Sequence, residues 1–406
     1  MSTPSEVADA PGWRARSEPR LLGHVRGGRP GATLLCVGAL HGNEPAGVEA
    51  LDRVLEGLRG REAALSGDFV ALLGNRAAFA SGRRFVDRDL NRAWTSERLA
   101  RLRAEGHLNG CAEDREQVEL LEAIEGVVAS SSGTVYVLDL HTTSGFGGPF
   151  TTFGDTLPNR DFAAHIPVPM ILGLEEQLDG TLLAFLGSHG LVAVVYETGQ
   201  HEEPRAVDRA EAGVWLALAA AGLVREGHIA EVTTARKLLG RELRDRPRVM
   251  EMRYRHPVSI EDGFRMDPGY RNFQPVRAGQ VVARDVHGEV SVREDGRILM
   301  PLYQAQGEDG FFLIKEFQPL WLRASTILRR LRVDRIAHWL PGVRRDPTTA
   351  DALIVDKRIA RWYALQLFHL LGYRKHEDAG TRLVMHRRRY DEYRFVRRPP
   401  EPEALV

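Results

Sequence analysis

Residues 32–44 read ATLLCVGALHGNE, an apolar run followed at once by a histidine and, three residues later, a glutamate. Runs of this kind are typical of strands buried on both faces of a parallel or mixed sheet. Three similar runs follow, at residues 68–73, 134–140 and 191–196. Helical patterns lie between them, at residues 45–58, 113–129 and 204–224. This alternation predicts an α/β sandwich over residues 21–240, preceded by a flexible segment at residues 1–20.

The chain changes character twice beyond residue 240. Residues 245–315 carry short alternating segments broken by turn signals such as Asp262-Gly263 and Asp295-Gly296, which predict a small β-rich barrel or sandwich. Residues 316–406 hold more Lys and Arg than Asp and Glu, with apolar residues at helical spacing. We therefore expect a basic, mainly helical C-terminal extension, whose core includes Trp339, Trp362 and Tyr363.

Composition excludes several classes of protein. The 406 residues suggest two or three domains, at about 100–200 residues each. A content of 43% hydrophobic and 27% charged residues excludes wholesale disorder and collagen-like repeats. Lys+Arg and Asp+Glu are both 55, so global binding to polyanions is not implied. Two cysteines, Cys36 and Cys111, make neither a disulfide framework nor a cysteine zinc site, and we expect a cytoplasmic location. The sequence shows no secretory signal and no membrane-spanning run.

Polar side chains follow three of the predicted strands. His41 and Glu44 come after the first run, His141 after the third and Glu197 after the fourth. Because functional residues of open α/β sheets gather outside the carboxyl ends of the strands, we expect these four side chains to meet at one edge. Two histidines and one glutamate form a known catalytic zinc set, which leaves a position open for water. Cobalt and manganese suit the same ligands.

The HxxE spacing is weak evidence by itself, since it also occurs at residues 228–231, in a charged helical stretch. Glu197 is the candidate general base, which would take a proton from water and pass it to the leaving group. A cap for the following helix is the other interpretation of Glu197. Asp139 precedes His141 by two residues and would orient its imidazole. An unrelated buried polar contact is the alternative for Asp139.

A long polar segment follows the second strand and contains several arginines. It includes Arg76 in the stretch 74–77 and Arg84, Arg88 and Arg92 in the stretch 84–92. Such loops are often functional, because an arginine fork binds carboxylates or stabilises an oxyanion. From spacing alone, we interpret Arg84 and Arg88 as solvated surface charges.

The motifs GALHGNEPAG, NRAA, DRDLNRAW, DLHTTSG and YETG, in this order, resemble the succinylglutamate desuccinylase/aspartoacylase family of zinc carboxypeptidase-like hydrolases. The resemblance covers residues 21–314 and implies a carboxypeptidase-like three-layer sandwich followed by a β-rich domain that shapes the pocket. It also implies a role for each matching residue. His41, Glu44 and His141 would bind one Zn²⁺, Glu197 would be the catalytic glutamate and Arg76 would polarise the scissile carbonyl. Asn91 and Arg92 would hold a substrate carboxylate, and Tyr303 would contact the substrate.

Aspartoacylases carry a further arginine about ten residues before the catalytic glutamate. Here residues 182–191 offer His189 but no arginine. The resemblance therefore implies that either His189 supplies part of that charge or the recognised substrate side chain is neutral or apolar.

Three functions remain open. The first is a zinc amidohydrolase or deacylase that cleaves a small N-acyl amino acid, by a mechanism that serves esters equally. The second is a metallocarboxypeptidase-like peptidase, and the third is a non-catalytic metal-binding homologue. The expected partner is a small-molecule substrate. For residues 316–406 we expect packing on the core, with an anionic membrane surface as an alternative and nucleic-acid binding third. Whether the chain forms a homo-oligomer stays open.

Overall fold

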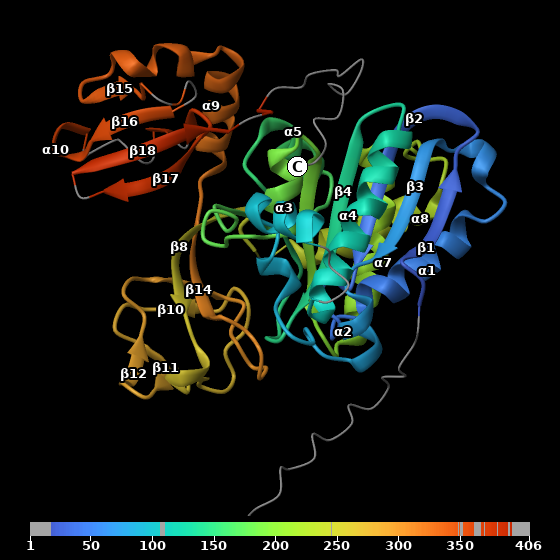
Figure 1. Cartoon of the computed structure of the whole chain (residues 1–406), viewed down its shortest axis with the longest axis horizontal. Coiled ribbons are helices and arrows are strands. Elements are labelled where there is room, and N and C mark those ends of the chain that lie inside the picture. The colour runs from blue at the N-terminus through green and yellow to red at the C-terminus, as the bar shows by residue number, and fades with distance from the viewer. Residues whose placement is uncertain are drawn as a thin grey trace, which may run out of the picture.

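The structure is a computed structural model, which describes residues 18–105, 110–244, 246–347, 349, 352–360, 367, 368, 370–379, 381–388, 390 and 391. Most of the flexible segment predicted at residues 1–20 therefore lies outside the described residues. Three sheets contain the described strands, and the largest one runs through the α/β part of the chain (Figure 1). No helix in the described part is long and apolar enough to cross a bilayer.

The largest sheet has eleven strands in the order β1-β3-β2-β4-β7-β5-β6-β8-β14-β13-β10. It is mixed, because β2, β3, β4 and β7 are parallel neighbours while β1, β5, β13 and β14 each make an antiparallel pair. Its strands are β1 (Leu21–Arg26), β2 (Arg29–Gly38), β3 (Ser66–Leu73), β4 (Val135–Thr143), β5 (Phe150–Thr152), β6 (Met170–Leu172), β7 (Val192–Gln200), β8 (Val249–Pro257), β10 (Pro275–Val276), β13 (Gly296–Leu299) and β14 (Asp309–Glu316).

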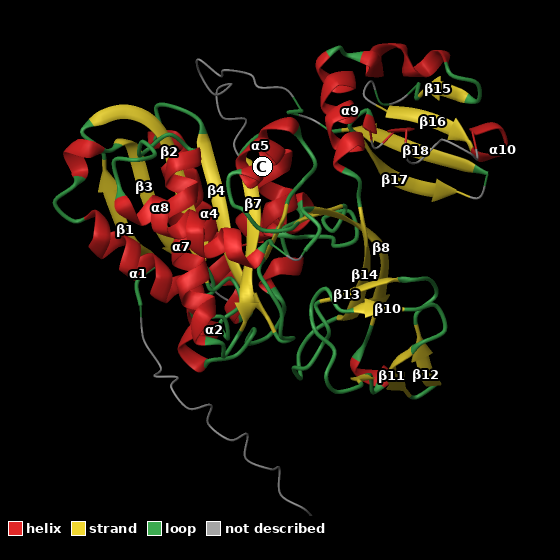
Figure 2. Cartoon of the chain, turned by 180° about the vertical axis from the view of Figure 1, so that it is seen from behind, coloured by secondary structure: helices red, strands yellow, loops and turns green. Residues whose placement is uncertain are grey.

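Helices cover both faces of this sheet, as Figure 2 shows. Successive strand residues point to opposite faces, so Leu34 and Cys36 enter one core while Leu35 and Val37 enter the other. The first core is closed by α1 (Ala46–Leu58), α5 (Leu157–Ala164), α7 (Pro204–Ala220) and α8 (Ala230–Glu242). The second is closed by α3 (Ser96–Glu105), α4 (Ala112–Ser130) and α6 (Leu182–Ser188). The predicted α/β sandwich with a mixed sheet is confirmed.

The β-rich part does not form a separate barrel. Strand β8 pairs in parallel with β6, with Met170 opposite Val249, so the large sheet continues from the α/β part into β8, β14, β13 and β10. Only β9 (Arg265–Met266), β11 (Val281–Asp285) and β12 (Gly288–Ser291) make a small sheet of their own. Strand-to-strand hydrogen bonds therefore join this part directly to the sheet that carries the predicted site.

The prediction of a mainly helical C-terminal extension is wrong. After α9 (Pro319–Arg330) and the 3-10 helix η4 (Val333–Trp339), four strands form an antiparallel sheet in the order β15-β16-β18-β17. They are β15 (Val343–Arg345), β16 (Ala352–Asp356), β17 (Tyr373–Ala379) and β18 (Arg382–Arg387), with the short α10 (Lys357–Ala360) after β16. A short apolar run fits a strand or a buried helix equally well, and pairing with β15 and β18 decides for a strand.

The predicted core position of Trp339 is also wrong, since 75% of this residue is exposed. Trp362 and Tyr363 lie outside the described residues. The remaining helices and 3-10 helices of the described chain are short: α2 (Arg76–Ser81), η1 (Glu62–Ala64), η2 (Leu90–Arg92) and η3 (Ile260–Asp262).

Buried ionic contacts join the C-terminal extension to the α/β part. Arg329 of α9 is almost fully buried, and its guanidinium donates to the Asp155 carboxylate at 2.8 Å and to Asp391 at 3.2 Å. Arg160 of α5 binds the same Asp155 carboxylate. Burial alone would raise the pKa of Asp155, but Arg160 and Arg329 hold that pKa well below its ordinary value. The contact between the C-terminal extension and the α/β part, called here the joint, is therefore stable only while these buried charges are paired, because burying an unpaired charge is costly.

Removal of the Arg329 guanidinium should destabilise the protein strongly. Arg329→Ala leaves the buried Asp155 and Asp391 carboxylates short of a partner, which typically costs about 3–5 kcal/mol. Urea unfolding measures the difference. Arg330→Ala, at the exposed neighbouring position, is the matched control, and a surface substitution of this kind should change stability by less than about 0.5 kcal/mol. Equal stability of the two variants would contradict a stabilising role for the joint.

Candidate metal centre and active site

The register of three parallel strands brings the predicted residues together. Strand β4 lies between β2 and β7, with Gly38 opposite Leu140 and His141 opposite Glu197. The carboxyl ends of these strands therefore coincide, and the chain leaves β2 through Ala39 in the left-handed region, at φ 51°. This is the edge at which the sequence predicted a site.

The turn that carries His41 and Glu44 is packed tightly against α2. A Cβ on Gly42 would lie 2.1 Å from the Ala78 carbonyl carbon, so no other residue fits there. The Gly42 N–H donates to the Arg84 carbonyl at 3.1 Å, and the Glu44 N–H donates to the His41 carbonyl at 3.2 Å. Helix α1 begins directly afterwards. The turn thus fixes two candidate ligands and the backbone of the Arg84 loop together.

The Glu44 carboxylate is the centre of the cluster. Nδ1 of His41 lies 2.9 Å from Glu44 Oε1, and Nδ1 of His141 lies 3.0 Å from Glu44 Oε2. One ligand atom from each of the three residues lies within 4.8 Å of the others, and all three residues are buried. This geometry makes His41, Glu44 and His141 a candidate metal-binding group.

Each histidine is oriented by a carboxylate on its other ring nitrogen. Nε2 of His141 lies 3.0 Å from Asp139, as the sequence predicted, and Nε2 of His41 lies 3.1 Å from Asp89. Carboxylates in this position fix the tautomer and ring direction of metal-binding histidines. Asp89 was not predicted, because it follows no buried strand and reaches His41 only through the fold of its loop.

Glu197 is buried beside this cluster, and its Oε2 has no hydrogen-bond partner among the described residues. Burial raises the pKa of Glu197 to about 8; Glu44 and Asp139 add to this effect and His141 opposes it. Its helix-capping alternative finds no support, since Glu203 and not Glu197 lies at the N-cap of α7. The group is thus a buried carboxyl with an unused oxygen at the edge of the metal-binding group.

The structure brings Arg84, and not Arg76, to the cluster. Arg84 donates from Nε and Nη2 to Asp89, at 3.2 and 2.9 Å, while its Nη1 lies 3.8 Å from Glu44. Although burial opposes it, Asp89 and Glu44 raise the pKa of Arg84, so this side chain is charged. The interpretation of Arg84 as a solvated surface charge is wrong, since its side chain is only 13% exposed.

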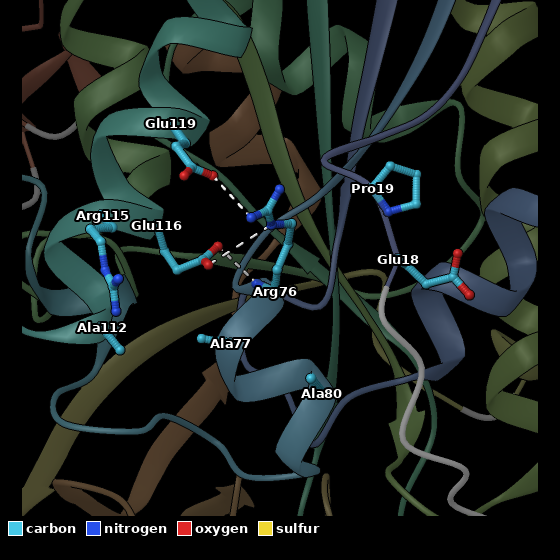
Figure 3. Close-up of a pocket in the computed structure, with 9 residues that line it drawn as sticks. All are labelled: Glu18, Pro19, Arg76, Ala77, Ala80, Ala112, Arg115, Glu116 and Glu119. Atoms are coloured by element: carbon cyan, nitrogen blue, oxygen red, sulfur yellow. Dashed lines mark hydrogen bonds and ion pairs between the residues drawn. The ribbon is translucent and has the colours of Figure 1, made fainter. Parts of the chain in front are cut away.

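Arg76 points to helix α4 instead. Figure 3 shows its guanidinium directed at Glu116 and Glu119, and Nη2 lies 3.4 Å from the Glu119 carboxylate. The groove it lines also includes Glu18 and Arg115 but none of the candidate metal ligands. Spacing could not separate the two arginines, because both follow β3 and the partners that fix them come from distant parts of the chain.

Asn91 and Arg92 lie close to the cluster but are bound by the protein itself. The Asn91 side chain accepts from the Leu182 N–H at 2.9 Å, at the start of α6. Arg92 donates from Nη2 to Asp309 at 2.8 Å and from Nη1 to the Asn91 carbonyl at 2.9 Å, and its buried Nε has no hydrogen-bond partner among the described residues. Asp309 also accepts from Arg255 Nε at 2.5 Å. Neither Asp309 nor Arg255 was predicted.

Tyr303 and His189 make other contacts. The Tyr303 hydroxyl donates to the Asp267 carbonyl at 2.8 Å and accepts from the Tyr270 N–H at 2.9 Å. His189 Nδ1 contacts the Phe185 carbonyl at 2.8 Å. The neighbour of Tyr303, Gln304, instead reaches the site and accepts from Asn43 at 3.0 Å.

His201 lies at the same edge, where its Nε2 is 3.1 Å from Gln304 Oε1 and its Nδ1 is 2.7 Å from the Thr142 hydroxyl. Burial lowers the pKa of His201. Its position four residues after Glu197 is the one signal in the sequence that could have pointed to it.

Comparison with known proteins agrees with this geometry. Residues 30–214 match the model of the succinylglutamate desuccinylase/aspartoacylase catalytic domain. This part of the chain is therefore similar to the catalytic domain of that family. Its candidate metal ligands and Glu197 all fall within the matched region.

The individual relatives are distant. A succinylglutamate desuccinylase of Ectopseudomonas mendocina is 42% identical over 62 residues, which is 15% of this chain and 18% of that protein. The chain thus matches less than a fifth of that relative's length. A succinylglutamate desuccinylase/aspartoacylase structure from Rhodobacter sphaeroides superposes with a TM-score of 0.55 and 18% identity, covering 73% of this chain and 88% of that one. The product-bound ectoine utilization protein EutE (DoeB) from Ruegeria pomeroyi superposes with a TM-score of 0.53 and 18% identity, covering 72% of this chain and 87% of that one. At this identity the superpositions show a shared fold.

Loss of Asp89 should weaken divalent-metal binding while the protein stays folded. Asp89→Ala frees the His41 ring to rotate, and removal of such an orienting carboxylate typically costs about 10–100-fold in metal affinity. Competition against a chromogenic chelator measures this affinity. Asp208→Ala, at an exposed position of α7, is the control and should bind metal like the parent, because Asp208 belongs to no candidate metal-binding group. Parent-like affinity in Asp89→Ala would show that the contact with His41 does not orient a ligand.

Proposed function

We propose that this protein is a zinc-dependent deacylase that hydrolyses the amide bond of a small N-acyl amino acid bearing one carboxylate. The observation that carries the proposal is the convergence of His41, Glu44 and His141 beside the unpartnered carboxyl oxygen of Glu197. A protein that only bound a metal would have no use for that buried oxygen, whereas a hydrolase needs a proton acceptor there.

The residues present fit zinc. Two neutral imidazoles and one carboxylate, with carboxylates on the outer ring nitrogens, form a zinc set that leaves a coordination position open. Three buried carboxylates, those of Glu44, Asp89 and Asp139, lie in and around the group against one arginine, Arg84, so a divalent cation would offset an excess of negative charge. When bound, zinc supplies Lewis-acid activation that makes hydroxide available at neutral pH.

Glu197 would move the proton in this reaction. Its unpartnered Oε2 would accept a proton from the attacking water and then deliver it to the departing amine nitrogen. A carboxyl whose pKa is raised by burial suits both steps, because it can hold the proton and release it near neutral pH. Burial of the site also keeps bulk water from competing for that proton.

Arg84 takes the role that the resemblance implied for Arg76. No hydrogen bond from the described residues occupies its Nη1, which faces the Glu44 side of the cluster while Asp89 holds the rest of the fork. A fixed cationic donor in a desolvated site stabilises the oxyanion that develops on the scissile carbonyl. The amide and ester forms of a substrate would use this contact equally.

Arg92 and Arg255 would bind the substrate carboxylate, with Asp309 setting the number of charges accepted. Two guanidinium groups and one carboxylate leave a net charge of one, which matches a single substrate carboxylate. The buried Nε of Arg92 is a donor ready for an acceptor. Arg255, from β8, would thereby supply the positive charge that aspartoacylases have in an arginine before the catalytic glutamate and that residues 182–191 lack here.

Contacts from the β-rich part favour a small substrate over a peptide. Gln304 contacts Asn43 and His201, and Asp309 contacts Arg92, so two segments beyond residue 300 close on loops of the α/β part. A screen of N-acyl amino acids, their esters and short peptides with the zinc-loaded protein tests the proposal. If the protein hydrolysed only peptides, the peptidase would be the better assignment. If the zinc-loaded protein hydrolysed none of these compounds, the non-catalytic homologue would be the better assignment.

Glu197→Gln should retain zinc and lose activity. An amide of the same shape can neither accept nor deliver the proton, so the rate should fall by about 10²–10⁴-fold. Metal content by mass spectrometry and turnover are measured on the same sample. Normal turnover at normal metal content would remove Glu197 from the mechanism.

Substitution of the two arginines should separate their roles. Arg84→Gln should lower kcat by about 10²–10³-fold, because the lost contact forms only as charge develops in the transition state. Arg76→Gln is the matched control, since Arg76 lies against α4, and its kcat should stay close to that of the parent. The reverse pattern would return the carbonyl contact to Arg76.

Asp309→Asn should change substrate preference. Loss of the carboxylate raises the net charge beside Arg92 and Arg255 by one, which should favour substrates with two carboxylates over those with one. The ratio of kcat/KM for N-acetylaspartate over N-acetylalanine should rise by about tenfold, as expected for one charge-assisted contact of ~1.5 kcal/mol. An unchanged ratio would show that Asp309 does not control the charge accepted.

A further inference from the structure

Helix α9 exposes apolar residues as well as burying some. Leu322 and Leu328 pack against the cores of the α/β part and of the extension. The buried face of α9 also carries the polar residues Ser325 and Arg329, while Leu320, Ile327 and Leu331 lie on the exposed side. The spacing of seven and four residues places these three apolar side chains on one face. A surface helix ordinarily buries its apolar stripe and exposes its polar one. The stripe Leu320, Ile327 and Leu331 is called here the apolar stripe.

Buried hydrogen bonds hold α9 in this orientation. Arg329 is fixed by Asp155 and Asp391, and the Ser325 hydroxyl donates to the Leu370 carbonyl at 2.7 Å and accepts from Arg160 at 3.1 Å. Rotation of the helix to hide the stripe would break these contacts and expose buried charges to an apolar environment. The hydrogen bonds that join the extension to the α/β part therefore keep the stripe exposed.

More apolar side chains are exposed in the segment of the chain that contains and follows the stripe. Of the thirteen large apolar side chains that are exposed among the described residues, seven lie between residues 320 and 359. They include two tryptophans, Trp321 at the start of α9 and Trp339 at the end of η4, which are 52% and 75% exposed. An exposed apolar concentration of this kind marks an interaction site.

The exposed charges of residues 317–345 are all positive. Residues 317–345 contain seven arginines and a single acidic residue, the buried Asp334. Arg323 and Arg330 flank the stripe on α9 and Arg335 follows on η4, and no described carboxylate pairs with any of the three. Exposed arginines of the α/β part, such as Arg53 and Arg61, pair with glutamates instead. The face is thus complementary to an anionic surface.

We propose that α9 and η4 form a docking face for an anionic lipid bilayer, with the apolar stripe in the headgroup region and the arginines on lipid phosphates. Tryptophan, leucine and isoleucine beside unpaired arginines are the composition of helices that lie in a membrane interface. Arginine stems cover apolar surface while their heads reach phosphate. A second copy of the chain fits less well, because a two-fold interface on this face would bring two positively charged surfaces together.

Flotation of the full-length protein with vesicles tests the proposal. The parent should float with vesicles of equal parts phosphatidylglycerol and phosphatidylcholine, and less at high salt or with phosphatidylcholine alone. The double variant Ile327→Asp with Leu331→Asp should bind these vesicles at least about tenfold more weakly than the parent. Ile260→Asp, at a 94% exposed position of the β-rich part, is the matched control and should bind like the parent.

Two further measurements keep the result interpretable. Thermal unfolding shows whether the double variant is folded, and both variants should hydrolyse a soluble substrate like the parent, because none of these residues contacts the site. Brominated lipids should quench parent fluorescence, and Trp321→Phe with Trp339→Phe should lose most of that quenching. Failure of the parent to float would overturn the proposal. The proposal would also be overturned if the parent were a dimer and the double variant a monomer. Binding to poly-glutamate that depends on the stripe, without binding to vesicles, would overturn it too.

Discussion

The excess of buried negative charge at the ends of β2, β4 and β7 constrains the rest of the site. Glu44, Asp89, Asp139 and Glu197 are all buried, and the Glu44 carboxylate lies between two imidazole nitrogens. Burial of unpaired carboxylates is costly, so the surrounding chain has to supply donors. The fold does so with Arg84, with the two histidines and with the Thr142 N–H, which donates to Glu44 at 2.9 Å. A divalent cation, as proposed above, would complete the same compensation.

The same constraint explains the loop that follows α2. Arg84 and Asp89 have to reach the cluster from a segment with little regular structure, and a buried carboxylate organises its backbone. Glu113 of α4 accepts from the Val86, Asp87 and Arg88 N–H groups, at 2.7 to 3.2 Å. It also accepts from the side chain of Asn75, which caps α2. One helix thus holds the segment that positions the arginine, the aspartate that orients His41, and the start of η2 with Asn91 and Arg92.

The sequence was sufficient for those features that depend on local pattern. Apolar runs located β2, β3, β4 and β7, and the residues directly after them identified the candidate metal-binding group, since parallel neighbours must end at one edge. Side-chain direction in irregular segments was not predictable. Arg76 and Arg84 differ only in which distant carboxylate they meet, Glu119 or Asp89, and only the tertiary fold decides that. Likewise residues 352–356 fit a strand or a buried helix until β15 and β18 pair with them. The burial of Arg329 on α9 was likewise not predictable, because the carboxylates that bind it, Asp155 and Asp391, come from distant parts of the chain.

If the proposed function holds, the continuous large sheet would fix the distance between the groups that bind the two ends of the substrate. His141 and Glu197 lie on β4 and β7, while Arg255 and Asp309 lie on the paired strands β8 and β14 of the same sheet. Groups held on strands are positioned more exactly than groups held on loops, so the distance from the reacting bond to the carboxylate contact should vary little. Such a site would select substrates by length as well as by charge, because a longer acyl amino acid could not place both ends at once. By contrast, Arg92 lies in η2 and Gln304 in the segment before β14. Under the proposed function, substitutions there would change the substrate without disturbing the strands that hold the candidate metal ligands.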